Sequence, residues 1–198
     1  RSRAIQMNSG AAIATGDVLV FLHGDCSFDS GWIAEVDTAI SNDFIGGCFS
    51  QKIQSDKFIC RSIASSGNIR AKVTKIFYGD QAIFIKKDAF TIVDKGDFWL
   101  SETPTKPGFG WDARINRICS WVLLQHNVTR KKMYCFNVHY DHQAVIARKE
   151  SSKLILEKIK TIAGSTPVIL TGDFNGDHSS EWYQLIANSG ILLDTYKR

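Results

Sequence analysis

Residues 167–175 read Pro-Val-Ile-Leu-Thr-Gly-Asp-Phe-Asn, an apolar run that ends on a polar turn. The apolar part predicts a buried strand, and Asp173 and Asn175 follow at its carboxyl end. Residues 132–139 predict another strand, which ends on His139. Between the two, residues 144–163 have the apolar periodicity of a long helix. Strands that alternate with helices in this way predict an α/β fold.

These side chains carry the groups that metal-assisted hydrolysis of a phosphate ester needs. The Asp173 carboxylate can activate a water or hold a hard cation, and the Asn175 amide can orient a phosphoryl oxygen. The His139 imidazole can transfer a proton or stabilise developing charge. The alternative is structural, because Asp and Asn also shape Asx turns and cap helices such as the one predicted over 180–188.

Two further polar residues, Asp141 and His142, follow the strand over 132–139. A zinc site made of His139, His142 and Asp173 is an alternative, although oxygen-rich phosphoryl sites favour Mg²⁺. Asp141 and His142 are otherwise expected to support the structure rather than to take part in chemistry.

Composition and charge limit the classes of function. The 198 residues are 44% hydrophobic and 22% charged, which is ordinary for a globular protein. Lys and Arg number 24 against 20 Asp and Glu, and the net charge of +4 suits an anionic substrate. Nucleic-acid binding is possible but not indicated, because no dense basic run occurs. No apolar stretch is long enough to predict a membrane span.

Five cysteines without a C-x-x-C pair predict small buried thiols in a reducing, cytoplasmic setting rather than a disulfide framework. The chain opens on Arg1 at the edge of a helix predicted over 3–14, so we expect the sequence to begin partway through a longer protein.

The first half of the chain predicts a different arrangement. Residues 18–22 form a continuous apolar run, as expected of a strand in a parallel sheet covered on both faces. The polar cluster His23-Gly24-Asp25 follows, and Asp29-Ser30 would cap a helix that carries Trp32. Residues 58–76 are ambiguous. The remaining predicted elements are strands over 44–54, 82–85, 114–125 and 191–193 and a loop that ends near residue 111.

Several motifs of the second half occur together and in order. They are Phe98-Trp99-Leu100-Ser101-Glu102-Thr103-Pro104, Gly110-Trp111-Asp112-Ala113, Asn137-x-His139-x-Asp141-His142, Ala147-Arg148, Gly172-Asp173-Phe174-Asn175 and Leu193-Asp194-Thr195, with Arg117 and Trp121 between them. With these motifs, residues 97–198 resemble the endonuclease/exonuclease/phosphatase superfamily, which has the DNase-I-like fold.

That resemblance implies a two-sheet sandwich and Mg²⁺- or Mn²⁺-dependent cleavage of phosphate esters. It implies that His139 faces the scissile phosphate and that Asn175 holds a phosphate oxygen. Asp173 would bind the metal and activate or position the attacking water. Arg117 would contact the phosphate or, equally well, pack beside Trp121.

Another set of motifs lies in the first half: Arg3-Ala4-x-Gln6-Met7-Asn8-x-Gly10-Ala11, Gly16-Asp17, Phe21-Leu22-His23-Gly24-Asp25 and Tyr78-Gly79-Asp80-Gln81-Ala82-Ile83-Phe84. Here residues 1–90 resemble family 2 glycosyltransferases. The resemblance implies a partial nucleotide-sugar-binding βα fold of the GT-A type. Asp25 would be a metal ligand, and Asp80 and Gln81 would face the donor–acceptor cleft.

Both resemblances cover partial domains, residues 1–90 and 91–198. The hydrolase part lacks the amino-terminal Asn and Glu of its family and the closing Asp-His pair, and the transferase part lacks its opening strand and late Glu-Asp pair. We therefore expect an α/β composite of half a DNase-I-like sandwich and a partial GT-A-like half. Its expected function is hydrolysis of a phosphodiester or phosphomonoester, impaired in this incomplete chain. Glycosyl transfer from a nucleotide-sugar and a non-catalytic composite are the alternatives.

Overall fold

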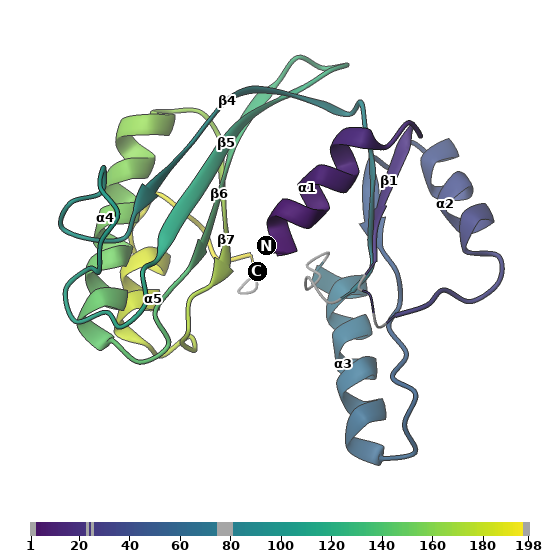
Figure 1. The fold of residues 1–198 in the computed structure, drawn as a ribbon, viewed down its shortest axis with the longest axis horizontal. Coiled ribbons are helices and arrows are strands. Elements are labelled where there is room, and N and C mark those ends of the chain that lie inside the picture. Colours follow the sequence, from purple (N-terminus) through teal and green to yellow (C-terminus); the bar gives the residue numbers. More distant parts are fainter. Residues whose placement is uncertain (1–2, 23, 25, 75–80, 196–198) are drawn as a thin grey trace. The chain divides into compact units, whose positions relative to one another are not determined.

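The computed structural model describes residues 3–22, 24, 26–74 and 81–195. The chain divides into two compact units, Arg1–Ala89 and Phe90–Arg198 (Figure 1). Each unit has its own sheet.

The N-terminal unit contains three helices and a three-stranded sheet in its described part. In chain order these are α1 (Arg3–Ile13), β1 (Val18–Phe21), α2 (Trp32–Ser41), β2 (Gly46–Cys48), α3 (Phe58–Thr74) and β3 (Ile83–Lys86). The strand order is β1-β3-β2, and β3 runs antiparallel to both neighbours.

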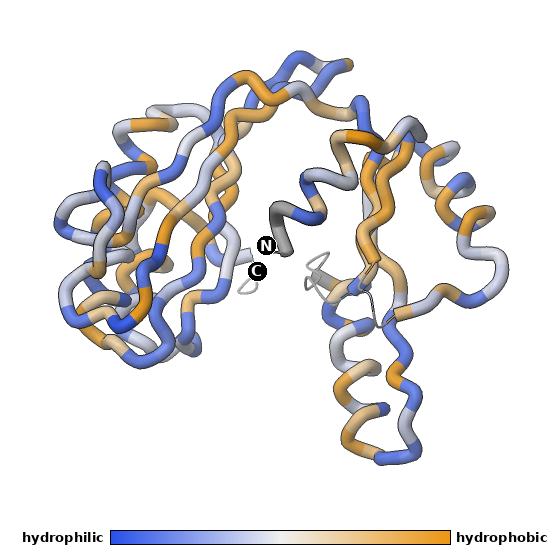
Figure 2. The backbone as a smooth tube through the Cα atoms, in the orientation of Figure 1, coloured by the Kyte–Doolittle hydropathy of each residue, from blue (hydrophilic) through white to orange (hydrophobic). Residues whose placement is uncertain are grey.

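An aromatic cluster of one buried ring, Phe84, and three partly buried rings packs within this unit. The ring centroids of Phe28 and Trp32 lie 4.5 Å apart in a stacked arrangement. Phe49 packs on Phe28 at 4.7 Å and on Phe84 of β3 at 5.8 Å. The hydrophobic colouring of β1 and β3 in Figure 2 agrees with this role, since both strands are built largely from Val, Leu, Ile and Phe. Such rings contribute both buried area and a preferred packing geometry.

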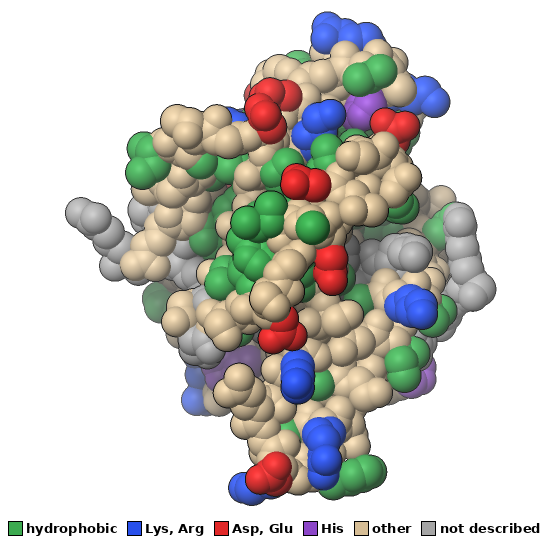
Figure 3. All heavy atoms as spheres, turned by 90° about the vertical axis from the view of Figure 1, so that its right-hand side faces the viewer, with side chains coloured by type: hydrophobic (Ala, Val, Ile, Leu, Met, Phe, Trp, Pro, Cys, Tyr) green, Lys and Arg blue, Asp and Glu red, His purple; other side chains and the backbone are tan. Residues whose placement is uncertain are grey.

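Apolar side chains are also exposed on this unit. On α3, Phe58 is 80% exposed and Val73 is 74% exposed. Figure 3 shows one face of the molecule, on which hydrophobic side chains lie among acidic and basic ones. Neither sign of charge dominates that face.

The structure corrects three predictions in this half. The strand over 18–22 forms as β1, but its partner β3 is antiparallel, because an apolar run indicates burial and not direction. Asp29-Ser30 does not cap α2; the N-cap is Gly31 in a left-handed conformation (φ 90°), without a side-chain cap bond. The strand over 44–54 is reduced to β2, and the ambiguous segment after it is helix α3.

The C-terminal unit contains a four-stranded sheet and two helices in its described part. They are β4 (Phe90–Trp99), β5 (Ile118–His126), β6 (Lys132–His139), α4 (Val145–Ala163), β7 (Val168–Asp173) and α5 (Glu181–Ala187). The strand order is β4-β5-β6-β7; β4, β5 and β6 are antiparallel, and β7 is parallel to β6. Helix α4 makes the crossover that a parallel pair requires.

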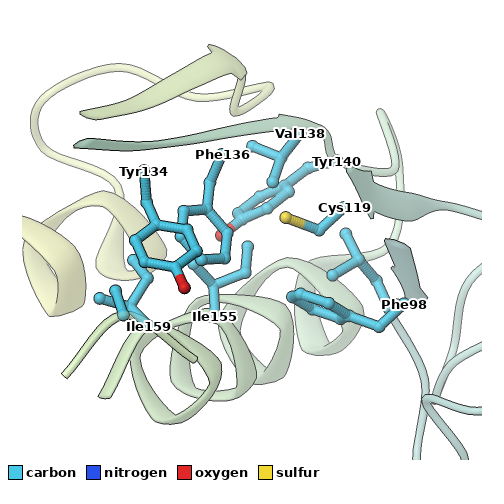
Figure 4. Close-up of a cluster of buried hydrophobic side chains, with 10 residues drawn as sticks. Phe98, Cys119, Tyr134, Phe136, Val138, Tyr140, Ile155 and Ile159 are labelled. Carbon is cyan, nitrogen blue, oxygen red and sulfur yellow. The ribbon is translucent and has the colours of Figure 1, made fainter. Parts of the chain in front are cut away.

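Strand alternation decides which side chains of β6 enter the core of this unit. Tyr134, Phe136 and Val138 are buried and face Ile155 and Ile159 of α4 (Figure 4). Each fully buried side chain of this size contributes about 1.5–3 kcal/mol. The intervening residues of β6 lie on the other face of the sheet, so Asn137 and His139 are exposed.

Most sequence predictions for this half are confirmed. The hairpin of β5 and β6, the two helices and the strand after residue 167 all form. The prediction missed β4, and the strand expected over 191–193 is wrong, because the described residues there belong to no strand. The prediction of buried thiols is confirmed only for Cys119, whose burial raises the pKa of its thiol to about 12. Cys48, Cys60 and Cys135 are partly buried, and Cys26 is exposed. Among the residues described, no helix has the length and apolar composition needed to cross a membrane.

Candidate active site

The parallel pair of β6 and β7 brings His139 and Asp173 side by side. They are the last register partners of the two strands, so their side chains lie on the same face of the sheet. His139 Nε2 lies 3.7 Å from Asp173 Oδ2. This separation is too long for a hydrogen bond but allows an ion pair when the imidazole is protonated. The side chains are 56% and 62% exposed, so both can be reached from solvent.

Asn175 joins this pair through the turn that follows β7. Its backbone N–H donates to Asp173 Oδ1 at 2.9 Å, and its φ of 46° lies in the left-handed region that Asn tolerates. Its side-chain Nδ2 donates to the Tyr140 carbonyl oxygen at 2.9 Å. An amide nitrogen carries two hydrogens, so the second N–H of Asn175 can donate to a ligand.

The ends of β6 and β7 are held together beyond the last register pair. The backbone N–H of Tyr140 donates to the Asp173 carbonyl oxygen at 2.9 Å. The Tyr140 side chain is completely buried, and its hydroxyl lies 3.0 Å from Ser152 Oγ of α4. Ser152 Oγ in turn donates to the Trp182 carbonyl oxygen at 2.9 Å. The strand ends that carry His139 and Asp173 are therefore connected to both helices.

Asp141 organises the backbone beside the site. It is 2% exposed, and its carboxylate accepts hydrogen bonds from the N–H groups of four residues, at 2.7–3.2 Å. These are Arg114, Ile115, Gln143 and Ala144. Burial by itself raises the pKa of Asp141, but the four N–H donors outweigh it and hold the pKa well below its usual value. All of its described contacts are structural, which agrees with the supporting role expected for Asp141.

Asp112 and Glu102 support the loop that precedes β5. Asp112 accepts the N–H of Ala147 at 2.6 Å and that of Ile146 at 3.3 Å, and it thereby caps the first turn of α4 from a distant part of the chain. Both carboxylate oxygens of Glu102 lie 3.1 Å from the backbone nitrogen of Trp111. The motif around residues 110–113 therefore fixes a loop and a helix end.

Arg148 of α4 has a buried guanidinium that contacts the backbone of Asn175. It is 8% exposed, and its Nη1 donates to the Asn175 carbonyl oxygen at 2.8 Å. Longer bonds of 3.4 Å run to the carbonyl oxygens of His142 and Gln143. The guanidinium carbon lies 4.1 Å from the centroid of a Trp182 ring, in cation–π geometry.

Two of the other predicted site residues, Arg117 and Gln81, lie in the described part of the chain. Arg117 is half-buried just before β5, and its backbone carbonyl accepts the N–H of Leu100 at 2.8 Å. Gln81 is 3% exposed and precedes β3 in the N-terminal unit. Asp25 and Asp80 lie outside the described residues.

The described residues do not by themselves form the expected metal site. Within the described ranges, no three His, Cys, Asp or Glu side chains converge, so the zinc alternative with His139, His142 and Asp173 is not formed. A hard divalent cation takes six or more oxygen ligands, usually with several carboxylates or waters. Asp173 offers a single carboxylate, and its Oδ1 already accepts the Asn175 N–H.

The sequence predicts His139, Asp173 and Asn175 as site residues but gives no role to the residues that support them. Asp112 and Arg148 contact partners that lie 27–35 residues away in sequence, so periodicity and spacing give no sign of their contacts. The only signal is their place within the motifs quoted above.

Comparison with known proteins gives relatives for part of the chain. No family model matches. The uncharacterized protein L388 of Acanthamoeba polyphaga mimivirus is 36% identical over 104 residues, which is 50% of this chain and 34% of that protein. The mannosyl-6-phosphatase of Bacteroides thetaiotaomicron is 47% identical with a TM-score of 0.55, over 59% of this chain and 44% of that one. This chain therefore spans less than half of either relative.

A more extensive structural match is an endonuclease/exonuclease/phosphatase from Bacteroides vulgatus. It is 26% identical with a TM-score of 0.52, over 78% of this chain and 61% of that one. These comparisons give no support to the glycosyltransferase resemblance or to a composite origin. The structure is an α/β fold similar to that of the endonuclease/exonuclease/phosphatase superfamily over much of the chain.

Proposed function

We propose that this chain carries the His139–Asp173–Asn175 part of a phosphoesterase active site and that its substrate is a phosphomonoester. The observation that carries the proposal is the placement of these three residues at the joined ends of β6 and β7. The 47% identity to a mannosyl-6-phosphatase supports a phosphomonoester, and it makes a hexose 6-phosphate the first substrate to test.

Each side chain has a chemical task in this proposal. Asp173 accepts a proton from the attacking water or orients it, because its carboxylate is accessible at the end of β7. The remaining N–H of the Asn175 amide donates to a phosphoryl oxygen. His139 beside the phosphate stabilises the charge that develops on the phosphoryl oxygens while the bond from phosphorus to the ester oxygen breaks, and the leaving alcohol takes its proton from solvent.

The Mg²⁺ or Mn²⁺ expected from the resemblance would supply charge stabilisation at the same phosphoryl group. The described residues offer it only the Asp173 carboxylate, so no step of the proposal depends on it. We propose that this shortage makes turnover slow, since the loss of one electrostatic donor already costs on the order of 10²–10³ in rate.

Phosphate release from mannose 6-phosphate and nitrophenol release from bis(nitrophenyl) phosphate test the proposal. Alanine at His139, Asp173 or Asn175 should each reduce turnover at least about tenfold. The matched control is His126→Ala, because His126 lies at the far end of the β5–β6 hairpin and contacts Thr129. Turnover that survives all three substitutions would place the active site elsewhere.

A further inference from the structure

Arg148 is a buried charged side chain that the proposed catalytic roles do not use. A guanidinium keeps its charge at all physiological pH values, and burying it is costly unless it is paired. No ion pair within the described part of the chain includes Arg148, and its Nε is buried without a hydrogen-bond partner there. Its contacts are three carbonyl oxygens and the face of Trp182.

Those carbonyls belong to the two loops that carry the site. His142 and Gln143 follow β6, the strand that ends on His139, and Asn175 follows β7, which ends on Asp173. The planar guanidinium of Arg148 thus reaches from α4 to both loops and bridges them. Because the guanidinium donors have fixed directions, the bridge constrains the spacing of the loops as well as their distance from α4.

The shortest of these bonds is the one to Asn175, whose backbone lies in the left-handed region. Asn175 has a positive φ, and three contacts fix it: its N–H to Asp173, its side-chain amide to Tyr140 and its carbonyl to Arg148. Without Arg148 the carbonyl of Asn175 loses its partner, and the backbone of Asn175 loses one of the three contacts that fix it. A shift of that backbone would carry the Asn175 side chain with it and change the direction of its second amide N–H.

We propose that Arg148 is a positioning residue, which sets the orientation of the Asn175 amide by holding its backbone carbonyl and by bridging the β6–α4 and β7–α5 loops. This inference rests on the proposed function for its catalytic consequence but not for its structural one. The proposed role does not require Arg148 itself to contact the substrate.

The test compares Arg148→Ala and Arg148→Lys with Lys149→Ala in the full chain. Lys149 is the matched control, because it also links α4 to α5, through an ion pair with Glu181, but has no described contact with the site loops. The first readout is independent of activity: the NMR signals of the Asn175 side-chain amide and the hydrogen exchange of its backbone N–H. Both should change in Arg148→Ala and remain as in the parent chain in Lys149→Ala.

The second readout is turnover of mannose 6-phosphate. Arg148→Ala should lower kcat on the order of 10–100-fold with little change in KM, since misplaced groups cost rate rather than ground-state binding. Added guanidinium should restore part of kcat in Arg148→Ala but not in Asn175→Ala. If Arg148→Ala does not fold, Arg148→Lys keeps the charge and loses the planar fork, and it should still shift the Asn175 signals.

The outcomes separate the two proposals. Asn175 signals that are unchanged in both Arg148 variants would overturn the positioning role, whatever the activity. An inactive parent chain in which Arg148→Ala still shifts the Asn175 signals would uphold the positioning role and reject the phosphoesterase proposal.

Discussion

Gly172 lies directly against the backbone of Val138, its register partner in β6. A Cβ built on Gly172 would overlap the Val138 carbonyl oxygen, and the φ of Gly172 is 142°, which L side chains rarely adopt. Only glycine therefore lets β7 approach β6 closely enough for His139 and Asp173, the next pair, to face each other.

We predict that Gly172→Ala destabilises the C-terminal unit by more than about 2 kcal/mol, because it combines backbone strain with a steric overlap. Hydrogen exchange of the β6 and β7 amides measures this loss within the unit. Gly164→Ala is the control: its φ is 57°, but nothing lies within 4 Å of an added Cβ. It should cost only the backbone strain of its conformation (φ 57°, ψ −118°), about 1–3 kcal/mol, and less than Gly172→Ala. Equal effects of the two substitutions would contradict the overlap.

A second prediction concerns the remote cap of α4. Asp112→Ala should lower stability by about 1 kcal/mol, because the backbone amides of Ile146 and Ala147 lose their acceptor and the helix dipole loses a nearby negative charge. Asp112→Asn keeps an acceptor and should recover more than half of the loss. The exchange rate of the Ala147 amide reports the cap directly. An amide that stays equally protected in Asp112→Ala would show that the cap contributes nothing.

Local interactions are the ones that the sequence predicts well. The segment from β6 to β7 is predictable because strand alternation, helix periodicity and the polar strand ends are all local signals. Strand β4 is not, because Asp94, Gly96 and Asp97 are residues depleted in strands. Its Gly96 is required by a tertiary contact, since a Cβ there would lie 2.7 Å from the ring of Trp121, which lies opposite in β5.

Helix α3 is ambiguous in the sequence because of where its apolar residues lie. Its apolar residues Phe58, Ile59, Ile63 and Ile69 are more than half exposed, so they do not mark a single buried face. The motif around Asn175 predicts a role for it in the site, and this stays a prediction. Arg148 cannot be assigned a role from sequence, because its contact with Asn175 is visible only after folding.

The lowered pKa of Asp141 leads to a prediction of pH dependence. A carboxyl whose pKa falls on folding stabilises the protein above its unfolded pKa of about 3.9, and this contribution is lost as the pH falls toward the folded value. Asp141→Asn should therefore cost about 2 kcal/mol or more at pH 7, where the carboxylate accepts four N–H bonds, and progressively less below about pH 4.

Hydrogen exchange in the C-terminal unit or thermal unfolding, recorded between about pH 2.5 and 7, measures the difference in stability between the parent chain and Asp141→Asn. The exposed Asp94 at the β4 bulge provides the control, since Asp94→Asn removes an equal charge with one local backbone contact. A loss of stability in Asp141→Asn that stays constant over this pH range would mean that the charge of the Asp141 carboxylate does not stabilise the loops whose N–H groups it accepts.

The last prediction concerns metal binding at Asp173. Mg²⁺ and Mn²⁺ prefer several oxygen ligands, and the described residues bring only this carboxylate to the cluster with His139. Calorimetric titration should therefore detect weak binding, and Asp173→Ala should abolish it, whereas Asp173→Asn should weaken it strongly because the amide carries no charge.

Asp25, expected to hold a metal from the other resemblance, lies outside the described residues, so Asp25→Ala tests whether it shares this ion. We expect Asp25→Ala to leave the Asp173-dependent binding unchanged, because the two residues belong to different sequence motifs whose spacing does not indicate one shared ion. Tight, submicromolar binding that survives Asp173→Ala would show that the metal, and with it the chemistry, is held by other residues.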